Sequence, residues 1–129
     1  MRLRNTCLVL VTLAVCACQS APTASTLSPA ASVEKYLRAK VARDATTIRQ
    51  LLCSDLEAQA ETEITTFEGA SNARIKGMTC TRVGESDIVK CTGKIIADYG
   101  TEANEFPLGA YKVKQEDSQW KWCGEATTN

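Results

Sequence analysis

The chain of 129 residues contains no histidine, the side chain that most often acts as a general base at neutral pH and most often binds metal. It has no excess charge either, with 15 basic and 15 acidic residues, so it gives no sign of the clustered basic face that a nucleic-acid-binding domain needs. No apolar run reaches the roughly 20 residues of a membrane-spanning helix. A G-x-S-x-G motif and a phosphate-binding loop are also missing. These absences give no support to histidine-based chemistry, nucleic-acid binding, a membrane-spanning helix or phosphate-loop chemistry.

The N-terminal segment, residues 1–17, has the layout of an export signal. Two arginines precede the apolar stretch LVLVTLAVCA, which has about the length of a secretory signal core. An ordinary signal peptide cleaved nearby is one interpretation. The stretch LAVCACQS resembles more closely the lipobox of a bacterial lipoprotein, with Val15, Cys16 and Ala17 before the cleavage point and Cys18 after it. Cys16 fits poorly as the modified residue, because Val15 would then sit directly before the cut.

The lipoprotein resemblance implies a membrane anchor at Cys18. In that chemistry the Cys18 sulfur receives a diacylglyceryl group, the chain is cut before Cys18, and the new amine is acylated. Several acyl chains anchor firmly, since each buried CH₂ contributes about 0.8 kcal/mol. The resemblance places the protein in the bacterial cell envelope, and Gln19 after the cysteine implies the outer membrane in a cell with two membranes. Residues 18–31 then read as the lipidated cysteine and a flexible Ser/Thr/Ala/Pro tether.

The folded domain is expected over residues 32–129, and its first half has helical periodicity. Two or three helices are predicted between residues 32 and 68. Asp44 fits the N-cap of the second helix, and Ser54 with Glu57 forms a capping-box pattern that opens a third. Gly69 fits the end of the third helix. The apolar positions behind this prediction are Val33, Tyr36, Leu37, Val41, Ile48, Leu51, Leu52, Leu56, Ala60, Ile64 and Phe67.

The second half has the pattern of β-hairpins. Residues 74–83 and 88–97 flank the turn GESD, and residues 110–114 and 119–123 flank QEDS. Residues 100–109 are expected to form a long loop, and its Phe-Pro-Leu sequence at 106–108 is either a recognition element or a plain connection. Helices followed by an antiparallel meander of about four strands predict an α+β fold with one face of the sheet packed on the helices.

Three stretches together resemble the nuclear-transport-factor-2-like superfamily, also called the cystatin-like cone fold. They are VEKYLRAKVARDATTIRQLLCSDL, the hairpins, and the ending YKVKQEDSQWKWCG. The resemblance implies a cone, incomplete because the strands are few, with a pocket between sheet and helices. Tyr36, Phe67, Trp120 and Trp122 are the candidate walls for an apolar small ligand. The alternative is that the two tryptophans simply close the core of a small domain.

Related domains often dimerise through the open sheet face. The hairpin near the C-terminus places three lysines on that face, Lys112, Lys114 and Lys121, which favours a monomer.

Some members of the superfamily are isomerases or dehydratases with Asp, Tyr or His inside the cone. The six candidates for such chemistry are Asp44, Asp55, Asp98, Tyr36, Tyr99 and Tyr111. Each has a structural explanation, as a helix start, a strand end or an apolar-stripe tyrosine. We therefore expect a binding or accessory module of the envelope without catalytic residues, metal or cofactor, which contacts an apolar ligand or an envelope protein. A small isomerase-type enzyme is the alternative.

The remaining four cysteines, Cys53, Cys80, Cys91 and Cys123, predict two disulfides in an oxidising compartment. Composition alone leaves three pairings open. If the first hairpin turns at 84–87, the register places Cys80 opposite Cys91, which leaves Cys53 to join Cys123. A structural zinc site is the weaker alternative, because the domain has no C-x-x-C spacing and no histidine.

Overall fold

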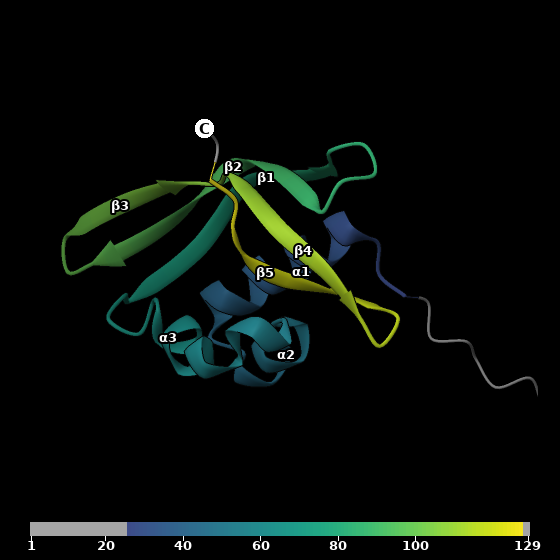
Figure 1. Ribbon diagram of the computed structural model, residues 1–129. Coiled ribbons are helices and arrows are strands. Elements are labelled where there is room, and N and C mark those ends of the chain that lie inside the picture. Colours follow the sequence, from purple (N-terminus) through teal and green to yellow (C-terminus); the bar gives the residue numbers. More distant parts are fainter. Residues whose placement is uncertain (1–25, 128–129) are drawn as a thin grey trace, which may run out of the picture.

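Helices at the start of the domain pack against one open antiparallel sheet in the computed structural model, which describes residues 26–127 (Figure 1). The helical elements are α1 (Pro29–Ala42), α2 (Ala45–Leu51), the 3₁₀ helix η1 (Ser54–Gln59) and α3 (Ala60–Thr65). The strands are β1 (Asn72–Arg82), β2 (Ile88–Tyr99), β3 (Glu102–Pro107), β4 (Ala110–Glu116) and β5 (Gln119–Glu125). The predicted α+β class is confirmed. The proposed lipidation site Cys18 lies outside the described residues, within which no helix is both long and apolar enough to cross a membrane.

Capping residues set the start of the first two helices. The side chain of Ser28 accepts a hydrogen bond from the backbone of α1, and Pro29 occupies the first helical position, where a missing N–H costs nothing. The helix thus begins three residues before the expected boundary at 32. Asp44 caps α2 as predicted, accepting from the backbone N–H of Thr47 at 3.1 Å.

The predicted capping box at the third helix is wrong. Ser54 turns away from Glu57 and donates its hydroxyl proton to Glu116 of β4 at 2.8 Å. The segment starts as a 3₁₀ helix, and the N-cap residue Cys53 makes no side-chain capping bond. The cause is tertiary, because the backbone N–H of Cys53 donates to the carbonyl of Trp122 in β5 at 2.9 Å. This hydrogen bond and the disulfide from Cys53 to β5 hold the backbone at the start of η1, so the local capping geometry does not form there.

The sheet has five strands, one more than predicted, in the order β1-β2-β4-β5 with β3 paired to the far half of β2. The expectation of a loop at 100–109 is therefore wrong. Gly100, in the left-handed region at φ 64°, turns the chain so that Tyr99 pairs with Glu102. Every residue of β3 is exposed, so the strand lacks the apolar alternation that would reveal it. β2 and β3 form an arm that extends beyond β4 and β5 (Figure 1).

The core lies between α1 and the inner face of the sheet. Tyr36 of α1 and Trp122 of β5 stack with ring centroids 4.3 Å apart, and both are buried. Trp120, two residues earlier, is only half-buried at the edge of the core, with the Arg82 guanidinium 4.7 Å from its ring centre. The two tryptophans therefore differ in role, since only Trp122 closes the core.

The structure contains both predicted disulfides. Cys80 and Cys91 face each other across β1 and β2 with Cα atoms 4.1 Å apart, as the register predicts. Cys53 and Cys123 join the end of α2 to β5 with Cα atoms 5.2 Å apart. Beside this bond Leu52 pairs with Trp122 in a parallel bridge. The segment after α2 therefore covers the edge of β5, which would otherwise offer free hydrogen-bonding groups to another chain.

Candidate ligand pocket

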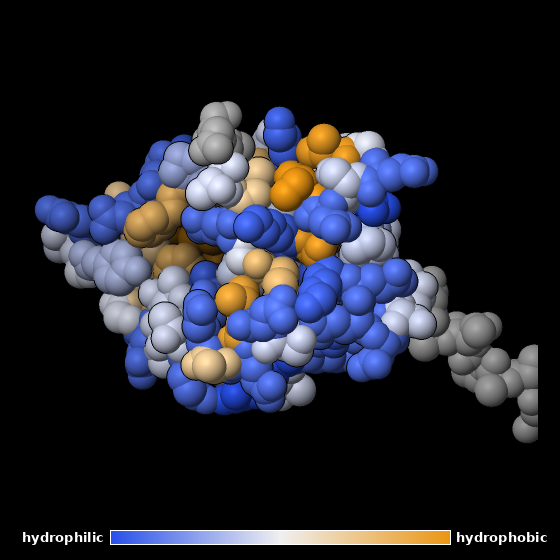
Figure 2. Space-filling model, in the orientation of Figure 1, coloured by the Kyte–Doolittle hydropathy of each residue, from blue (hydrophilic) through white to orange (hydrophobic). Residues whose placement is uncertain are grey.

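Most of the aromatic side chains surround one cavity, which we call the aromatic cavity. It has a volume of about 300 Å³ and lies between the C-terminal half of α1, the chain after α3, the β2–β3 arm and the start and end of the last hairpin. Figure 2 shows apolar side chains in a hollow between the arm and the helices. Its size is at the lower end of the range for small-molecule sites, which starts near 300 Å³. Five of the seven aromatic residues of the chain line it: Phe67, Tyr99, Phe106, Tyr111 and Trp122.

Two of the four predicted wall residues, Phe67 and Trp122, line the aromatic cavity. Tyr36 lies outside the lining, on the far side of Trp122, as the second layer of the stack. Trp120 is not part of the lining either. The remaining apolar wall comes mainly from β2 and the β3 region, including Ile95, Phe106 and Leu108. For Phe106 and Leu108 the only signal in the sequence was the Phe-Pro-Leu stretch.

Phe67 and Phe106 form the floor and the rim on the side of the β3 arm. Phe67 follows α3 and is only 6% exposed, whereas Phe106 on β3 is 43% exposed. Their rings meet edge to face, with centroids 6.1 Å apart and an interplanar angle of 62°. This arrangement is favourable for aromatic pairs, and Phe106 remains partly exposed to solvent while it lines the cavity.

A compact polar group lies beside Trp122, and one of its members, Lys40, lines the cavity. The Lys40 ammonium lies 2.7 Å from Glu63 Oε2 and 5.6 Å from the Trp122 ring centre. The Tyr36 hydroxyl donates to the same Glu63 oxygen at 2.8 Å. Burial, together with this carboxylate, raises the pKa of Tyr36 far above its ordinary value. Tyr36 is therefore a permanent neutral donor, and Glu63 balances the charge of Lys40.

Glu125 and Tyr111 supply further polar groups to the lining. Glu125 is exposed at the end of β5 and lies opposite Tyr111 in the β4–β5 pairing. Burial raises the pKa of Tyr111, and the negative charge of Glu125 adds to the effect. At neutral pH the Tyr111 hydroxyl is thus a hydrogen-bonding group without charge.

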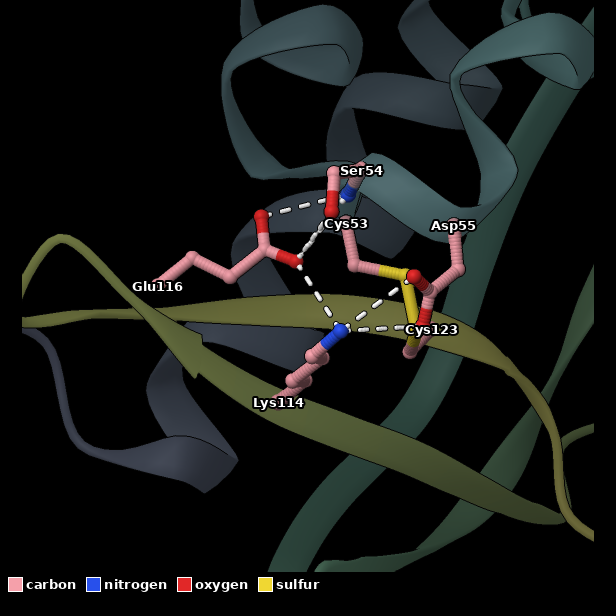
Figure 3. A network of polar contacts seen from close by, with 6 residues as sticks. All are labelled: Cys53, Ser54, Asp55, Lys114, Glu116 and Cys123. Atoms are coloured by element: carbon pink, nitrogen blue, oxygen red, sulfur yellow. Dashed lines mark hydrogen bonds and ion pairs between the residues drawn. A yellow bond between two sulfur atoms is a disulfide. The ribbon is translucent and has the colours of Figure 1, made fainter.

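A second hollow, of about 250 Å³, lies beside the Cys53–Cys123 disulfide. A polar network that we call the clasp surrounds this disulfide, formed by Ser54, Asp55, Lys114 and Glu116 (Figure 3). The Glu116 carboxylate accepts from the backbone N–H and the hydroxyl of Ser54, at 3.1 and 2.8 Å. The Lys114 ammonium lies 3.0 Å from Asp55 and 3.7 Å from Glu116.

The polar groups of the clasp interact with one another, with one lysine ammonium between two carboxylates. The hydrogen bond with Asp55 raises the pKa of Lys114, and the hydrogen bond from Ser54 lowers the pKa of Glu116. Ser54, Asp55 and Lys114 are solvent-exposed and Glu116 is partly exposed, so salt will weaken their interactions. Their common effect is to hold the start of η1 against β4, next to the disulfide that joins the same segment to β5. We therefore assign the clasp a structural role and take the aromatic cavity as the candidate site.

Two of the three lysines expected on the open face contact the chain that crosses the β5 edge. Lys114 belongs to the clasp, and the Lys121 ammonium donates to the backbone carbonyl of Gln50. Lys112 is exposed.

One group of side chains among residues 26–127 has the proximity that a metal site requires. The ligand atoms of Cys53, Asp55 and Cys123 lie within 4.8 Å of one another. The two sulfur atoms are bonded to each other, so neither is available as a thiolate ligand.

No family model and no curated protein matches the chain, whereas solved structures do. One is a variant of the designed protein Rd1NTF2_05, with 10% identity and a TM-score of 0.52, covering 72% of this chain and 90% of that one. Another is the solution structure of a SEC-C motif containing protein from Rhodopseudomonas palustris, with 14% identity and a TM-score of 0.51, covering 78% and 80%. The fold is nuclear-transport-factor-2-like. At these identities the likeness concerns the fold alone.

Within this nuclear-transport-factor-2-like fold, none of the three candidate catalytic aspartates lines the aromatic cavity. Asp44 caps α2, Asp55 pairs with Lys114, and Asp98 pairs with Arg74 at 2.8 Å. The two candidate tyrosines on strands, Tyr99 and Tyr111, do line the cavity, together with the unpredicted Lys40 and Glu125. These last two residues belong to no motif, and only the fold brings them together.

Proposed function

We propose that the protein is a lipid-anchored binding module of the bacterial cell envelope whose aromatic cavity takes a small, largely apolar molecule. The observation that carries the proposal is the convergence of five aromatic side chains on one open cavity. Aromatic walls bury large areas and contribute most of the affinity in such sites. Phe106 is 43% exposed and Tyr99 is partly exposed, so their rings are accessible to an occupant, whereas Phe67, Tyr111 and Trp122 form the buried part of the wall.

The position of the cavity along α1 fits an anchored receptor. Cys18 lies ten residues before Ser28, the residue that caps the start of α1. The cavity is lined by Leu37 and Lys40, near the other end of this 14-residue helix. A helix of that length spans about 20 Å, so the cavity lies well away from the point where the tether joins. The two disulfides support an oxidising compartment outside the cytoplasm.

Intact mass spectrometry of the protein from bacterial membranes tests the anchor. The expected mass is that of a chain starting at Cys18 with acyl chains attached. Four cysteines should accept an alkylating label only after reduction. A chain without acyl groups, or four cysteines that label without reduction, contradicts the assignment.

Binding of N-phenyl-1-naphthylamine, a neutral apolar fluorophore, tests the cavity. Phe106→Asp places a charge on the rim and is expected to weaken binding about tenfold, since half-burying a Phe side chain contributes about 1 to 1.5 kcal/mol. Val83→Asp is the matched control, because Val83 is equally exposed (41%) but does not line the cavity. If the fluorophore does not bind, or both variants weaken it equally, the cavity is not the binding site.

A small isomerase or dehydratase is the second candidate, because the Glu125 carboxylate and the Tyr111 hydroxyl line the same cavity. Turnover that Glu125→Gln abolishes while ligand affinity persists would establish this candidate. We also propose that the protein is a monomer, with the exposed Lys112 opposing a dimer through the open sheet face. Light scattering after gel filtration gives the mass that decides this point.

A further inference from the structure

Of the two charged side chains that line the aromatic cavity, one forms an ion pair within the described part of the chain and the other does not. Lys40 and Glu125 line it with opposite signs. The charge of Lys40 is already balanced, because its ammonium lies 2.7 Å from Glu63 and both side chains are largely shielded, at 16% and 14% exposure. Glu125 has no ion-pair partner within residues 26–127. The cavity therefore carries one uncompensated negative charge on its wall.

The effect of this charge reaches the aromatic side chains. Glu125 lies opposite Tyr111 in the β4–β5 pairing, and its charge helps to raise the pKa of that hydroxyl. The Glu125 carboxylate would likewise repel an anion in the cavity, whereas it would attract a cation.

The aromatic faces suit a cation as well. A positive charge over an aromatic ring is attracted by the electrons of the ring face, most strongly when the cation is weakly hydrated, as a quaternary ammonium is. The chain already makes one such contact in this place, with the Lys40 ammonium 5.6 Å from the Trp122 ring centre. Tyr99, Phe106 and Tyr111 provide further rings in the lining of the cavity.

We propose that the aromatic cavity takes a free organic ammonium compound, with its charged group near Glu125 and its apolar body against Phe67 and Leu108. This inference rests on the proposed function, since it names the ligand class of the same site. Glu125 supplies the charge, and the aromatic rings supply both apolar contact area and cation–π attraction.

Competition against bound N-phenyl-1-naphthylamine tests the charge preference with three probes of similar shape. Benzyltrimethylammonium is the cation, neopentylbenzene is its neutral carbon analogue, and phenylacetate is the anion. We expect the cation to displace the fluorophore at about a threefold to tenfold lower concentration than the neutral analogue, as an ion pair and a cation–π contact at a partly exposed site together allow. Phenylacetate should be the weakest, and the advantage of the cation should shrink in high salt.

Two variants assign this preference to residues. Glu125→Gln should raise the concentration at which the cation displaces the fluorophore about threefold and leave the concentration needed for the neutral analogue unchanged. Glu85→Gln, at an exposed acid in the β1–β2 turn, is the matched control and should change nothing. Phe106→Leu keeps an apolar side chain but removes the ring, so it should weaken the cation more than the neutral analogue.

Each outcome separates this inference from the proposal on which it rests. If the fluorophore binds and the neutral analogue or phenylacetate competes as well as the cation, the cation assignment is wrong while the cavity remains a binding site. If the fluorophore does not bind at all, the proposed function fails and the cation assignment with it. If phosphatidylcholine vesicles compete as strongly as the free ammonium probe, the occupant is a lipid head group and the assignment to a free compound is overturned.

Discussion

Removing the Cys53–Cys123 disulfide is expected to cost more stability than removing Cys80–Cys91. A disulfide acts mainly by restricting the unfolded chain, and the restriction grows with the length of the loop it closes. The two bonds close loops with sequence separations of 70 and 11 residues. The loop-entropy relation gives about 4.4 kcal/mol for the long loop and about 2.8 kcal/mol for the short one. Each is a large share of the 5 to 15 kcal/mol that is typical of a whole domain.

Urea denaturation of two double variants tests this order. Cys53→Ala with Cys123→Ala removes the long-loop bond, and Cys80→Ala with Cys91→Ala removes the short one. Each pair contains one buried and one partly buried cysteine, so the packing losses are similar. The free energy of unfolding should fall about 1.5 kcal/mol further for the first variant, which moves the urea midpoint by roughly 0.5 to 1.5 M more. Equal losses, or a larger loss at the short bond, would refute an unfolded-state origin of the stabilisation.

Three further perturbations follow from local geometry. Gly93→Ala should lower the free energy of unfolding by about 2 to 4 kcal/mol, because φ at Gly93 is 97° and an added Cβ would lie 2.6 Å from the backbone of β1. Gly109→Ala is the control, because Gly109 has open space around it. Above about pH 10 the stability of the wild-type protein should fall as the pH rises, and the Tyr36→Phe variant should lose less stability per pH unit, as measured by urea midpoints. Asp44→Ala should lower the melting temperature because the cap on Thr47 is lost, and Asp44→Asn should retain most of the stability at neutral pH.

The two pH effects have opposite directions. The pKa of Tyr36 is raised in the folded state, so unfolding releases a proton once the pH passes the ordinary value of 10.0. Stability then falls with pH by up to about 1.4 kcal/mol per unit, and the Phe variant lacks this slope. The pKa of Asp44 is lowered by hydrogen bonds from Thr47, so its contribution exists above its ordinary value of 3.8 and disappears as the pH falls below it. A Tyr36→Phe variant with an unchanged alkaline slope, or an Asp44→Asn variant with an unchanged acid slope, contradicts these assignments.

Features set by local rules were predictable from the sequence. The GESD turn fixes the first hairpin, and because side chains alternate along a strand, that register alone places Cys80 opposite Cys91. Asp44 likewise precedes a run with helical spacing and caps it. In each case the signal and the structure lie within a few residues of one another.

Features set by distant contacts were not predictable. β3 is exposed at every position, so Glu102 to Pro107 carries no alternation, and the strand exists because β2 offers an edge to it. Ser54 and Glu57 have the form of a capping box, but Glu116, 62 residues from Ser54, takes the serine hydroxyl proton instead.

The walls of the aromatic cavity divide in the same way. Phe67 and Trp122 lie on apolar stripes and were predicted. Tyr99, Phe106 and Glu125 lie on strands that meet only in the folded sheet, so their spacing in the sequence contains no signal. The fold class was accessible because hydrophobic periodicity reports it, whereas the site depends on the pairing of strands.

Chemical-shift mapping by NMR with N-phenyl-1-naphthylamine tests most directly the central claim that the aromatic cavity is the binding site. Titration into the ¹⁵N-labelled protein should shift the backbone amides of Phe67, Ile95, Phe106 and Leu108, which line the aromatic cavity. The amide of Ser54, beside the second hollow, should not move. Saturable shifts confined to the first group support the account. Shifts centred on Ser54, or none at concentrations that saturate the fluorescence, would contradict it.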